Sequence, residues 1–497
     1  MNPQVVIVGG GPTGLLLGCE LRLAGVRVTV LERLPEPGNE SRSLVLGNRS
    51  VESLNQRGLD RFSGAPRARE FKFGMIDLTA AVPAEALPVR APQWQVEEML
   101  RERALRLGVD LRPGHEAVGL EQDEESATVD VRHDGGSYRL TALYVAGCDG
   151  AHSTVRKLSG IGFPGTEATV SAVTGEMILP DDPFDGRVFI ELFASGMVSV
   201  IPLGDGLHRV ASVEFGTQPP PRGVPVTAEE IRESVRRVSG LDLRFGEIKW
   251  TSRFGDATRL AETYRRGRVV LAGDAAHIHF PAGGPGMNTG LQDVANLGWK
   301  LAAAVAGWAP PGLMDTYHTE RHLVGERVCD YSRAQISLMH PLNRIGPLRD
   351  LFAGIIGAGR AEAGRYLVEA MTGLDIAYPV EGDHPLTGRR VPHVPLVADG
   401  GATSVPRLLH EGRGVLLDLS EGTADLREAD AWRDRIDVVA ARPAPELDAV
   451  AVLIRPDGYA AWAAGPDTAD VAEGLRQALT TWFGESVRPP ARAGRPK

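Results

Sequence analysis

The sequence predicts a multidomain α/β protein. Three observations support this: a strand, turn, helix and second strand follow one another within residues 4–32, alternating strands occupy residues 165–265, and short strands with a last helix follow residue 395. The length of 497 residues is enough for about three domains of typical size.

Composition excludes several classes of protein. The chain has 54 Lys and Arg against 64 Asp and Glu, a net charge of −10, with 43% hydrophobic and 24% charged residues. A disordered or fibrous chain is excluded, because this composition buries real cores. An acidic chain is also a poor partner for nucleic acid, so we expect no nucleic-acid binding.

Cysteine usage and the N-terminus favour a cytoplasmic protein. Cys19, Cys148 and Cys329 are too far apart for a metal knuckle or a CxxC pair, so we expect a reduced setting and no metal site. The apolar run that starts at Val5 is broken by glycines at residues 9–11, too early for an export signal or a membrane span.

The first unit reads as a βαβ motif. Residues 4–8 form a short apolar run typical of a buried parallel strand, residues 13–24 have apolar side chains at helical spacing, and residues 27–31 predict a second strand. Gly25 stands where a helix would stop. The sequence therefore predicts a Rossmann-like start.

A glycine pattern lies between the first strand and the helix. Gly9-x-Gly11-x-x-Gly14 permits a tight turn, close approach of a pyrophosphate and close packing of helix on strand. Glu32 ends the second strand, where a carboxylate accepts hydrogen bonds from a ribose. An acid here favours FAD or NAD over NADP in this site.

Two later segments carry polar residues after strands. Asp149 follows the strand at residues 144–147, where it could also be a plain helix cap. Asp274 follows the buried run at residues 268–272, and open α/β sheets bind ligands at such strand ends. A long helix is expected over residues 288–307, with its N-terminus toward the same cleft, whereas His277 is expected to be a packed or capping histidine.

Together these segments resemble the class A FAD-dependent aromatic hydroxylases, which are flavoprotein monooxygenases. The resemblance rests on the glycine pattern with Glu32, on Cys148-Asp149-Gly150-Ala151-His152-Ser153-x-x-Arg156, and on residues 268–277 followed by Pro281. Within that class, residues 12–15, 20–25 and 32–33 are similar to the subgroup that acts on aromatic polyketides and related antibiotics. The likeness covers about residues 1–380 and, more loosely, the tail.

The resemblance implies a set of FAD-binding residues. Glu32 would hold the adenosine ribose, Thr13 the pyrophosphate, and Asp274 the ribityl or pyrophosphate region. Gly286 and Met287 would offer backbone N–H groups at the pyrimidine edge of the ring. Further cofactor-binding positions implied by the same motifs are Gly9, Gly11, Gly14, Arg33, Arg42, Gln93, Asp149, Pro281 and Asn288.

Some of these positions are implied with particular roles. Gln93, four residues before Glu97, matches a glutamine that touches the flavin, and Arg42 matches an arginine near its moving ring. Asp149 would serve both FAD and the reduced pyridine nucleotide, supported by Arg156.

The predicted domains follow from these patterns. Residues 1–70, 90–165 and 266–380 form a discontinuous FAD-binding domain, and residues 71–89 and 166–265 form a substrate-binding domain with an inserted antiparallel sheet. Residues 381–395 are a linker. Residues 396–497 resemble the thioredoxin-like tail of phenol-hydroxylase-type relatives but contain no cysteine, so packing or dimer contact is their expected role.

The resemblance implies a single-component monooxygenase. NADPH or NADH would reduce FAD, O₂ would add at its C4a carbon, and a polycyclic phenolic substrate of the polyketide type would attack the flavin hydroperoxide, as in antibiotic biosynthesis. No catalytic nucleophile is expected, because the chain has no GxSxG elbow and the chemistry is carried by the cofactor.

Four alternatives stay open. Baeyer–Villiger oxidation or epoxidation could occur on the same scaffold, and an NAD-dependent dehydrogenase or a non-catalytic flavin-binding protein would share the glycine pattern. The protein is expected to be a monomer or a homodimer.

Overall fold

A six-stranded sheet forms the core of the N-terminal part of the protein, in the order β19-β20-β11-β1-β2-β7. The computed structural model describes residues 2–38, 41–220, 223–357 and 361–486. All neighbours in this sheet are parallel except β19 and β20. The strands are β1 (Val5–Val8), β2 (Val28–Glu32), β7 (Asp110–Pro113), β11 (Tyr144–Gly147), β19 (Arg265–Arg266) and β20 (Val269–Leu271).

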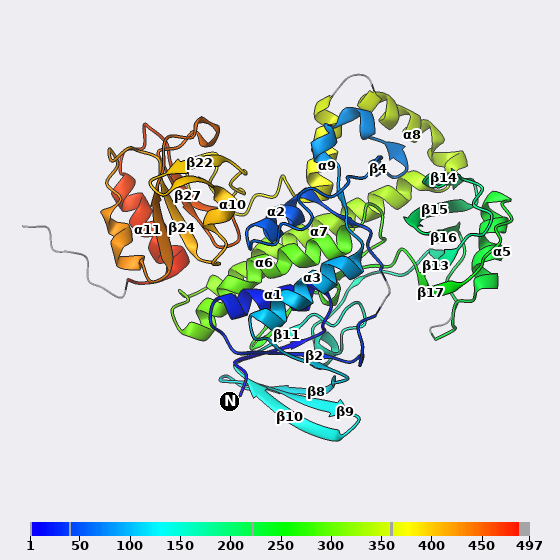
Figure 1. The fold of residues 1–497 in the computed structure, drawn as a ribbon, viewed down its shortest axis with the longest axis horizontal. Helices are drawn as coiled ribbons and strands as arrows, with labels where there is room; N and C mark the ends of the chain where they lie inside the picture. Colours follow the sequence, from blue (N-terminus) through cyan, green and yellow to red (C-terminus); the bar gives the residue numbers. More distant parts are fainter. Residues whose placement is uncertain (1, 39–40, 221–222, 358–360, 487–497) are drawn as a thin grey trace, which may run out of the picture.

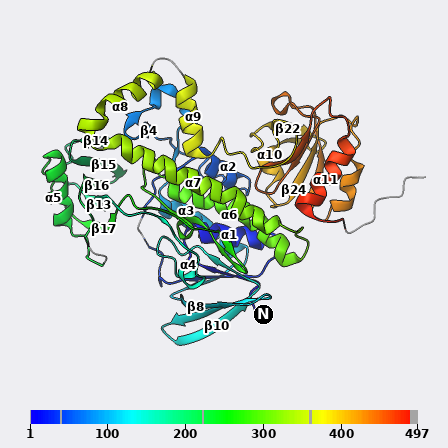
Figure 2. The same ribbon diagram turned by 180° about the vertical axis from the view of Figure 1, so that it is seen from behind.

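Helices cover one face of this sheet and a small sheet lies on the other (Figures 1 and 2). Every residue of β1 is buried, as its apolar run predicts. The covering helices are α1 (Pro12–Leu23), α3 (Gln93–Arg106) and α6 (Pro285–Ala306), and the small antiparallel sheet comprises β8 (Glu116–Gln122), β9 (Ala127–His133) and β10 (Gly136–Ala142).

The alternating strands of the middle region form a second sheet, in the order β14-β15-β16-β13-β17. All neighbours are antiparallel, as the sequence predicts. Helix α5 (Ala228–Ser239) packs its apolar side chains on the outer face, away from the main sheet (Figure 1). The strands are β13 (Val170–Ile178), β14 (Phe189–Phe193), β15 (Gly196–Gly204), β16 (Leu207–Phe215) and β17 (Ile248–Phe254).

Three helices follow α6. Helix α7 (Leu313–Met339) is continuous, and it is followed by α8 (Leu342–Gly357) and α9 (Ala361–Thr372), with residues outside the described ranges between these two. The hairpin of β4 (Lys72–Phe73) and β5 (Ile76–Asp77) packs mainly against these three helices.

The C-terminal unit has a four-stranded sheet, in the order β25-β24-β26-β27. The expected strands and last helix are present, and one more strand, β27, was not foreseen. These elements are β24 (Gly414–Asp418), β25 (Ile436–Ala440), β26 (Ala451–Ile454), β27 (Ala460–Ala464) and α11 (Val471–Phe483). Residues 387–390 of the expected linker pair with residues 459–460, so this segment is docked on the unit.

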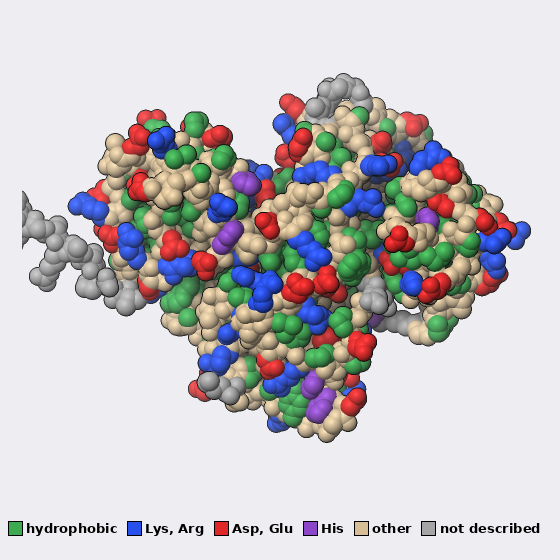
Figure 3. All heavy atoms as spheres, viewed as in Figure 1, with side chains coloured by type: hydrophobic (Ala, Val, Ile, Leu, Met, Phe, Trp, Pro, Cys, Tyr) green, Lys and Arg blue, Asp and Glu red, His purple; other side chains and the backbone are tan. Residues whose placement is uncertain are grey.

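Shorter elements connect these layers. They are β3 (Val45–Leu46), α2 (Asn48–Asn55), β6 (Val89–Arg90), α4 (Thr154–Leu158), β12 (Gly165–Thr166), β18 (Thr258–Leu260), β21 (His277–Ile278), β22 (Pro395–Ala398), β23 (Gly401–Ser404) and α10 (Val405–Leu408), with 3₁₀ turns at Thr79–Ala81, Ala84–Ala86, Gly273–Ala275, Arg427–Trp432 and Pro445–Leu447. Within the described ranges, no helix combines the length and hydropathy needed to cross a membrane. Acidic and basic side chains are interspersed on the face seen in Figure 3.

Candidate cofactor and substrate site

The predicted binding residues meet at one edge of the main sheet. Gly9, Glu32, Asp149 and Asp274 end or follow β1, β2, β11 and β20, which are neighbours in the order β20-β11-β1-β2. Because parallel strands end at the same edge, all four residues lie there, across a width of about 14 Å for three strand spacings. Two stretches separated by more than two hundred residues therefore share one edge of the sheet. We call this edge, with Gly9, Glu32, Asp149 and Asp274, the trough.

The glycines of the first turn are required by the packing around them. Gly9 has φ +108°, and a Cβ on it would lie 2.3 Å from the carbonyl oxygen of Cys148. A Cβ on Gly14 would lie 2.0 Å from the carbonyl oxygen of Gly9. A Cβ on Gly11 would meet nothing within 4 Å, so this position opens onto free space before the N-terminus of α1. That opening fits a pyrophosphate, since the helix end offers free N–H groups to anions.

Glu32 fastens the turn to the second strand. Its Oε2 accepts a hydrogen bond from the backbone N–H of Gly10 at 2.7 Å, and its Oε1 accepts one from Leu34 at 2.9 Å. Each carboxylate oxygen has a further lone pair for a ribose hydroxyl. Arg33, next in sequence, is exposed.

Thr13 connects the first turn with the second motif. A Cβ on Gly290 would lie 2.5 Å from Oγ1 of Thr13, and one on Gly273 would lie 2.9 Å from the same atom. Asp274 is exposed in the turn that follows β20, and its Oδ1 lies 3.6 Å from the Cβ position of Gly286. The N-termini of α1 and α6 therefore converge on the same turn.

A buried ion cluster supports that turn from beneath. Asp293 of α6 accepts hydrogen bonds from the backbone N–H of Gly273 at 3.0 Å and from Nε of Arg321 at 2.8 Å, and it pairs with Nε2 of His277 at 2.8 Å. Burial raises the pKa of Asp293, but the charges of Arg321 and His277 outweigh it and hold this pKa below its usual range. His277 is a packed residue, as expected.

Asp149 has its oxygens committed to a helix start. Its Oδ2 accepts from the backbone N–H groups of Thr154 and Val155 at 2.6 and 3.1 Å, and its Oδ1 accepts from the Ser153 hydroxyl. Arg156 donates to the carbonyl oxygen of Ala275 at 2.8 Å, joining this segment to the turn after β20. The N-cap residue of α4 is Ser153, and Asp149 supports the same helix start by accepting from its first N–H groups.

Gln93 and Arg42 lie on the other side of the trough. Oε1 of Gln93 accepts from the backbone N–H of Ser43 at 3.3 Å, and its Nε2 donates to Oε1 of Glu97 at 2.8 Å. Burial raises the pKa of Glu97, which the nearby Arg42 charge opposes and the Glu32 charge reinforces. Gln93, Arg101, Glu32 and Arg42 therefore all act on the half-buried carboxylate of Glu97.

The loop before α6 completes the site. Helix α6 begins at Pro285, three residues before its expected start, after Gly284 with φ +66°. Met287 is half-buried in the first turn, and the buried Asn288 accepts from the N–H of Gly47 at 2.7 Å and donates to the carbonyl oxygen of Gly284 at 2.8 Å. Pro281 is exposed at the start of the loop.

Sequence reasoning missed several residues of this site. The sequence did not indicate Asp293, Arg321 or Gly290. The one available signal was the position of Asp293 within the apolar stripe of α6, which is typical of a buried acid. His279 was also missed, although it lies beside Gly286, and burial with the neighbouring His277 charge lowers its pKa.

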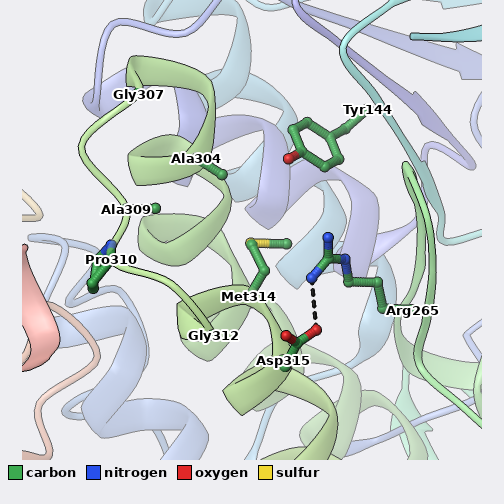
Figure 4. Close-up of a pocket in the computed structure, with 9 residues that line it drawn as sticks. All are labelled: Tyr144, Arg265, Ala304, Gly307, Ala309, Pro310, Gly312, Met314 and Asp315. Atoms are coloured by element: carbon green, nitrogen blue, oxygen red, sulfur yellow. Dashed lines mark hydrogen bonds and ion pairs between the residues drawn. The ribbon is translucent and has the colours of Figure 1, made fainter. Parts of the chain in front are cut away.

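Two cavities lie outside the trough. One, of about 490 Å³, opens between β14, α8 and the β4-β5 hairpin and is lined by Met75, Ile190, Leu192 and Arg349 among others. The other, of about 350 Å³, lies at the opposite edge of the main sheet, near Tyr144 at the start of β11, and contains an ion pair at 2.7 Å between Arg265 and Asp315 (Figure 4). Only the first adjoins the inserted sheet.

Apolar residues join the inserted sheet to the loop before α6. Met75, Met197, Phe254 and Phe280 pack in one cluster, whereas Phe193 lies on the outer face under α5. Phe193 faces outward because side chains alternate along β14.

The fold and the site together define a dinucleotide-binding α/β protein with an inserted antiparallel sheet. Residues 2–332 match the family described as FAD binding domain, and residues 384–486 match the one described as Aromatic-ring hydroxylase, C-terminal. The chain belongs to this family of FAD-dependent aromatic-ring hydroxylases and is a flavoprotein monooxygenase, which confirms the predicted resemblance, fold class and cofactor.

Full-length relatives agree with this assignment. The chain is 42% identical to 12-dehydrotetracycline 5-monooxygenase/anhydrotetracycline 6-monooxygenase of Streptomyces rimosus, over 99% of this chain and 100% of that protein. It is 41% identical to the dialkyldecalin synthase of Streptomyces rugosporus, over 98% and 100%. The solved structure of the anhydrotetracycline hydroxylase of Streptomyces rimosus superposes with a TM-score of 0.90 at 42% identity, over 99% of this chain and 100% of that one.

Proposed function

We propose that the protein hydroxylates a polycyclic aromatic phenol of the polyketide type, with NADPH or NADH as electron donor. The observation that carries the proposal is the pairing of a complete FAD trough with an inserted sheet whose inner face adjoins the loop before α6. The relatives that act on tetracycline precursors support this substrate class.

Six residues of the trough have a specific proposed role in binding FAD. Glu32 accepts from the adenosine ribose, Gly11 and Thr13 bind the pyrophosphate through backbone N–H groups, and Asp274 binds the ribityl region. Gly286 and Met287 present N–H groups to the pyrimidine edge, where the start of α6 favours negative charge. Bound FAD supplies the reduction and oxygen activation.

The remaining protein contribution is positioning and exclusion of water. The apolar cluster of Met75, Met197, Phe254 and Phe280 closes one side of the space over the trough. A dry site protects the reactive oxygen for transfer, and a fixed substrate plane holds the attacked carbon in reach. No side chain is needed as a nucleophile.

The proposal includes the organisation of the chain. The FAD-binding domain comprises residues 1–70, 90–165 and 266–380, the substrate domain comprises 71–89 and 166–265, and 396–497 is the C-terminal domain, whose residues 487–497 lie outside the described ranges. Residues 381–395 connect them. We place the protein in the cytoplasm as a monomer or homodimer.

The test is NAD(P)H consumption by the yellow holoenzyme with a panel of polycyclic phenols, followed by product structure. We expect one phenol to accelerate NAD(P)H oxidation and to gain one hydroxyl oxygen. An inserted ring oxygen or an epoxide would assign the reaction to the alternatives instead.

A cyclisation without net redox change is the second candidate, because the dialkyldecalin synthase is as similar as the monooxygenases. That activity would retain FAD and convert its substrate without consuming NAD(P)H.

A further inference from the structure

The inner face of the inserted sheet is organised in rows across its strands. One row consists of Ile190, Ser199, Ala211, Thr174 and Ser252, which pair in register from β14 to β17. Side chains of neighbouring positions on these strands face α5 and are buried, so this row faces the opposite way. Four of its five members are small, and all but Ser199 are only half-buried.

Larger side chains border this row on both sides. One flanking row consists of Leu192, Met197, Val213, Ala172 and Phe254, of which only Ala172 is small, and the other contains Ile201, Arg209, Glu176 and Trp250. Rows on one face are about 6.6 Å apart, so the backbones of the two flanking rows lie about 13 Å apart on either side of the small row. This width accepts a flat fused-ring system lying on the sheet, and the 490 Å³ cavity adjoins its β14 end through Ile190 and Leu192.

The polar flank is a buried ion pair with unused hydrogen-bonding capacity. Arg209 donates to Oε1 of Glu176 and to the carbonyl oxygen of Ser41, and its guanidinium carbon lies 4.9 Å from the ring centre of Trp250. Arg209 and Glu176 are each 7% exposed. Nε of Arg209 and Nε1 of Trp250 are buried and have no partner among the described residues.

Such a pair offers a substrate one hydrogen-bond donor and one acceptor. The unpartnered N–H of Arg209 can donate to a substrate oxygen, and a carboxylate oxygen of Glu176 can accept from a substrate hydroxyl. The free Nε–H of Arg209 and the second carboxylate oxygen of Glu176 lie on either side of the hydrogen bond that joins the two groups, so they are further apart than the atoms of one hydrogen bond. They therefore match two oxygens on alternate ring carbons better than two on adjacent carbons.

We infer that Arg209 and Glu176 are specificity-determining residues that bind one edge of the substrate, an edge with two oxygens in a 1,3 relation. The inference rests on the proposed function and adds the orientation of the ring system. The oxygenated edge lies against β13 and β16, and the apolar edge lies toward Met197 and Phe254.

The test is equilibrium binding to the FAD-loaded protein without NAD(P)H, followed by tryptophan fluorescence and by the flavin absorbance change. The probes are naphthalene-1,3-diol, naphthalene-2,3-diol and 1-naphthol. We expect the 1,3-diol to bind tenfold or more tightly than either other probe, the size of one hydrogen bond to a charged group. Trp250→Phe should remove most of the fluorescence change.

Two variants and one matched control separate orientation from folding. Arg209→Met and Glu176→Gln should bring the three affinities within about threefold of one another, less than one such hydrogen bond contributes. Glu176→Gln keeps a hydrogen-bond acceptor for Arg209 but removes the carboxylate charge, so the urea stability of both variants is measured beside their affinities. Arg253→Met removes a comparable ion pair, with Glu230 at 2.6 Å, from the outer face of the same sheet and should leave the preference unchanged.

The inference is overturned if the wild-type protein does not prefer the 1,3-diol, or if Arg209→Met and Glu176→Gln keep the preference. It is also overturned if Arg209→Met loses flavin, because Arg209 would then serve the Ser41 segment of the cofactor site. Failure of the proposed function has a different signature: preferential binding of the 1,3-diol by the yellow protein with no phenol-dependent NAD(P)H oxidation.

Discussion

Replacing Glu320 by glutamine measures how much one buried ion network holds the C-terminal unit on the FAD-binding domain. Arg455, on the C-terminal side, donates to both carboxylate oxygens of Glu320 at 2.7 and 2.8 Å. Lys300 of α6 donates to Oε2 at 2.7 Å. Glu320 is 2% exposed, so solvent screens these contacts little.

The magnitude follows from the pKa of Glu320. Burial raises it, but the charges and hydrogen bonds of Arg455 and Lys300 outweigh burial and lower the pKa from 4.5 to about 2. This difference corresponds to about 3 kcal/mol of unfolding free energy. Burial also lowers the pKa of Lys300 to about 8. The loss in unfolding free energy follows the Glu320 shift, because glutamine removes the carboxylate and leaves the lysine in place.

The sign of the pH dependence is fixed by the direction of this shift. The folded-state pKa lies below that of the unfolded chain, so the stabilisation is complete above about pH 4.5 and is lost as the pH falls toward 2. We therefore expect Glu320→Gln to be less stable than wild type by about 3 kcal/mol at pH 7. At pH 3.5 we expect this stability difference to be smaller by about 1 kcal/mol.

The assay is urea unfolding followed by tryptophan fluorescence, since the guanidinium of Arg455 lies 4.6 Å from the ring centre of Trp482. Asp425→Asn is the matched control. Hydrogen bonds from Arg427 also lower the pKa of Asp425 to about 2, but this pair is on the surface. We expect no measurable change at physiological salt. Equal stability of the two variants at pH 7, or a gap that does not narrow at pH 3.5, would refute the reasoning.

Two further predictions concern the cofactor trough. Asp274→Ala should weaken FAD retention about tenfold by removing one charged hydrogen-bond acceptor, whereas the surface change Glu124→Ala should not; equal flavin content in the two purified proteins would contradict the site assignment. Gly290→Ala places a Cβ 2.5 Å from Oγ1 of Thr13, so it should separate α6 from the first turn and lower the flavin-to-protein ratio. Gly346→Ala meets nothing within 4 Å and is its control, and unchanged flavin content in both variants would show that the two motifs do not pack as described.

The sequence predicts the local parts of the fold well. Strands β1, β2, β11 and β20, the inserted strands β13 to β16 and the last helix have strong periodicity and clear turn residues, and they lie where the sequence predicts them, whereas β7 and β17 were not foreseen. Failures occur where periodicity gives no boundary. Strand β27, for example, is an alanine-rich run that reads equally as helix.

The sequence predicts which residues of the candidate site would contact a ligand, but not which residues hold them in place. The motif residues of the trough can be named from the sequence, because glycine and acid positions after strands have few structural alternatives. Asp293, Arg321 and the pair of Arg209 with Glu176 depend on partners tens to hundreds of residues away. Their pairing exists only once strands and helices are packed, so no local pattern contains it.

Two adjacent residues of α7 show why these distant partners matter together. Glu320 reaches Arg455 of the C-terminal unit, and Arg321 reaches Asp293, which holds the turn after β20. Both are fully charged groups withdrawn from water, so neither can lose its partner without leaving a buried charge. Because one helix turn is stabilised by both networks, docking of the C-terminal unit and the shape of the FAD trough depend on the same segment. A C-terminal unit without redox cysteines can therefore contribute to the cofactor site through the position of α7 alone.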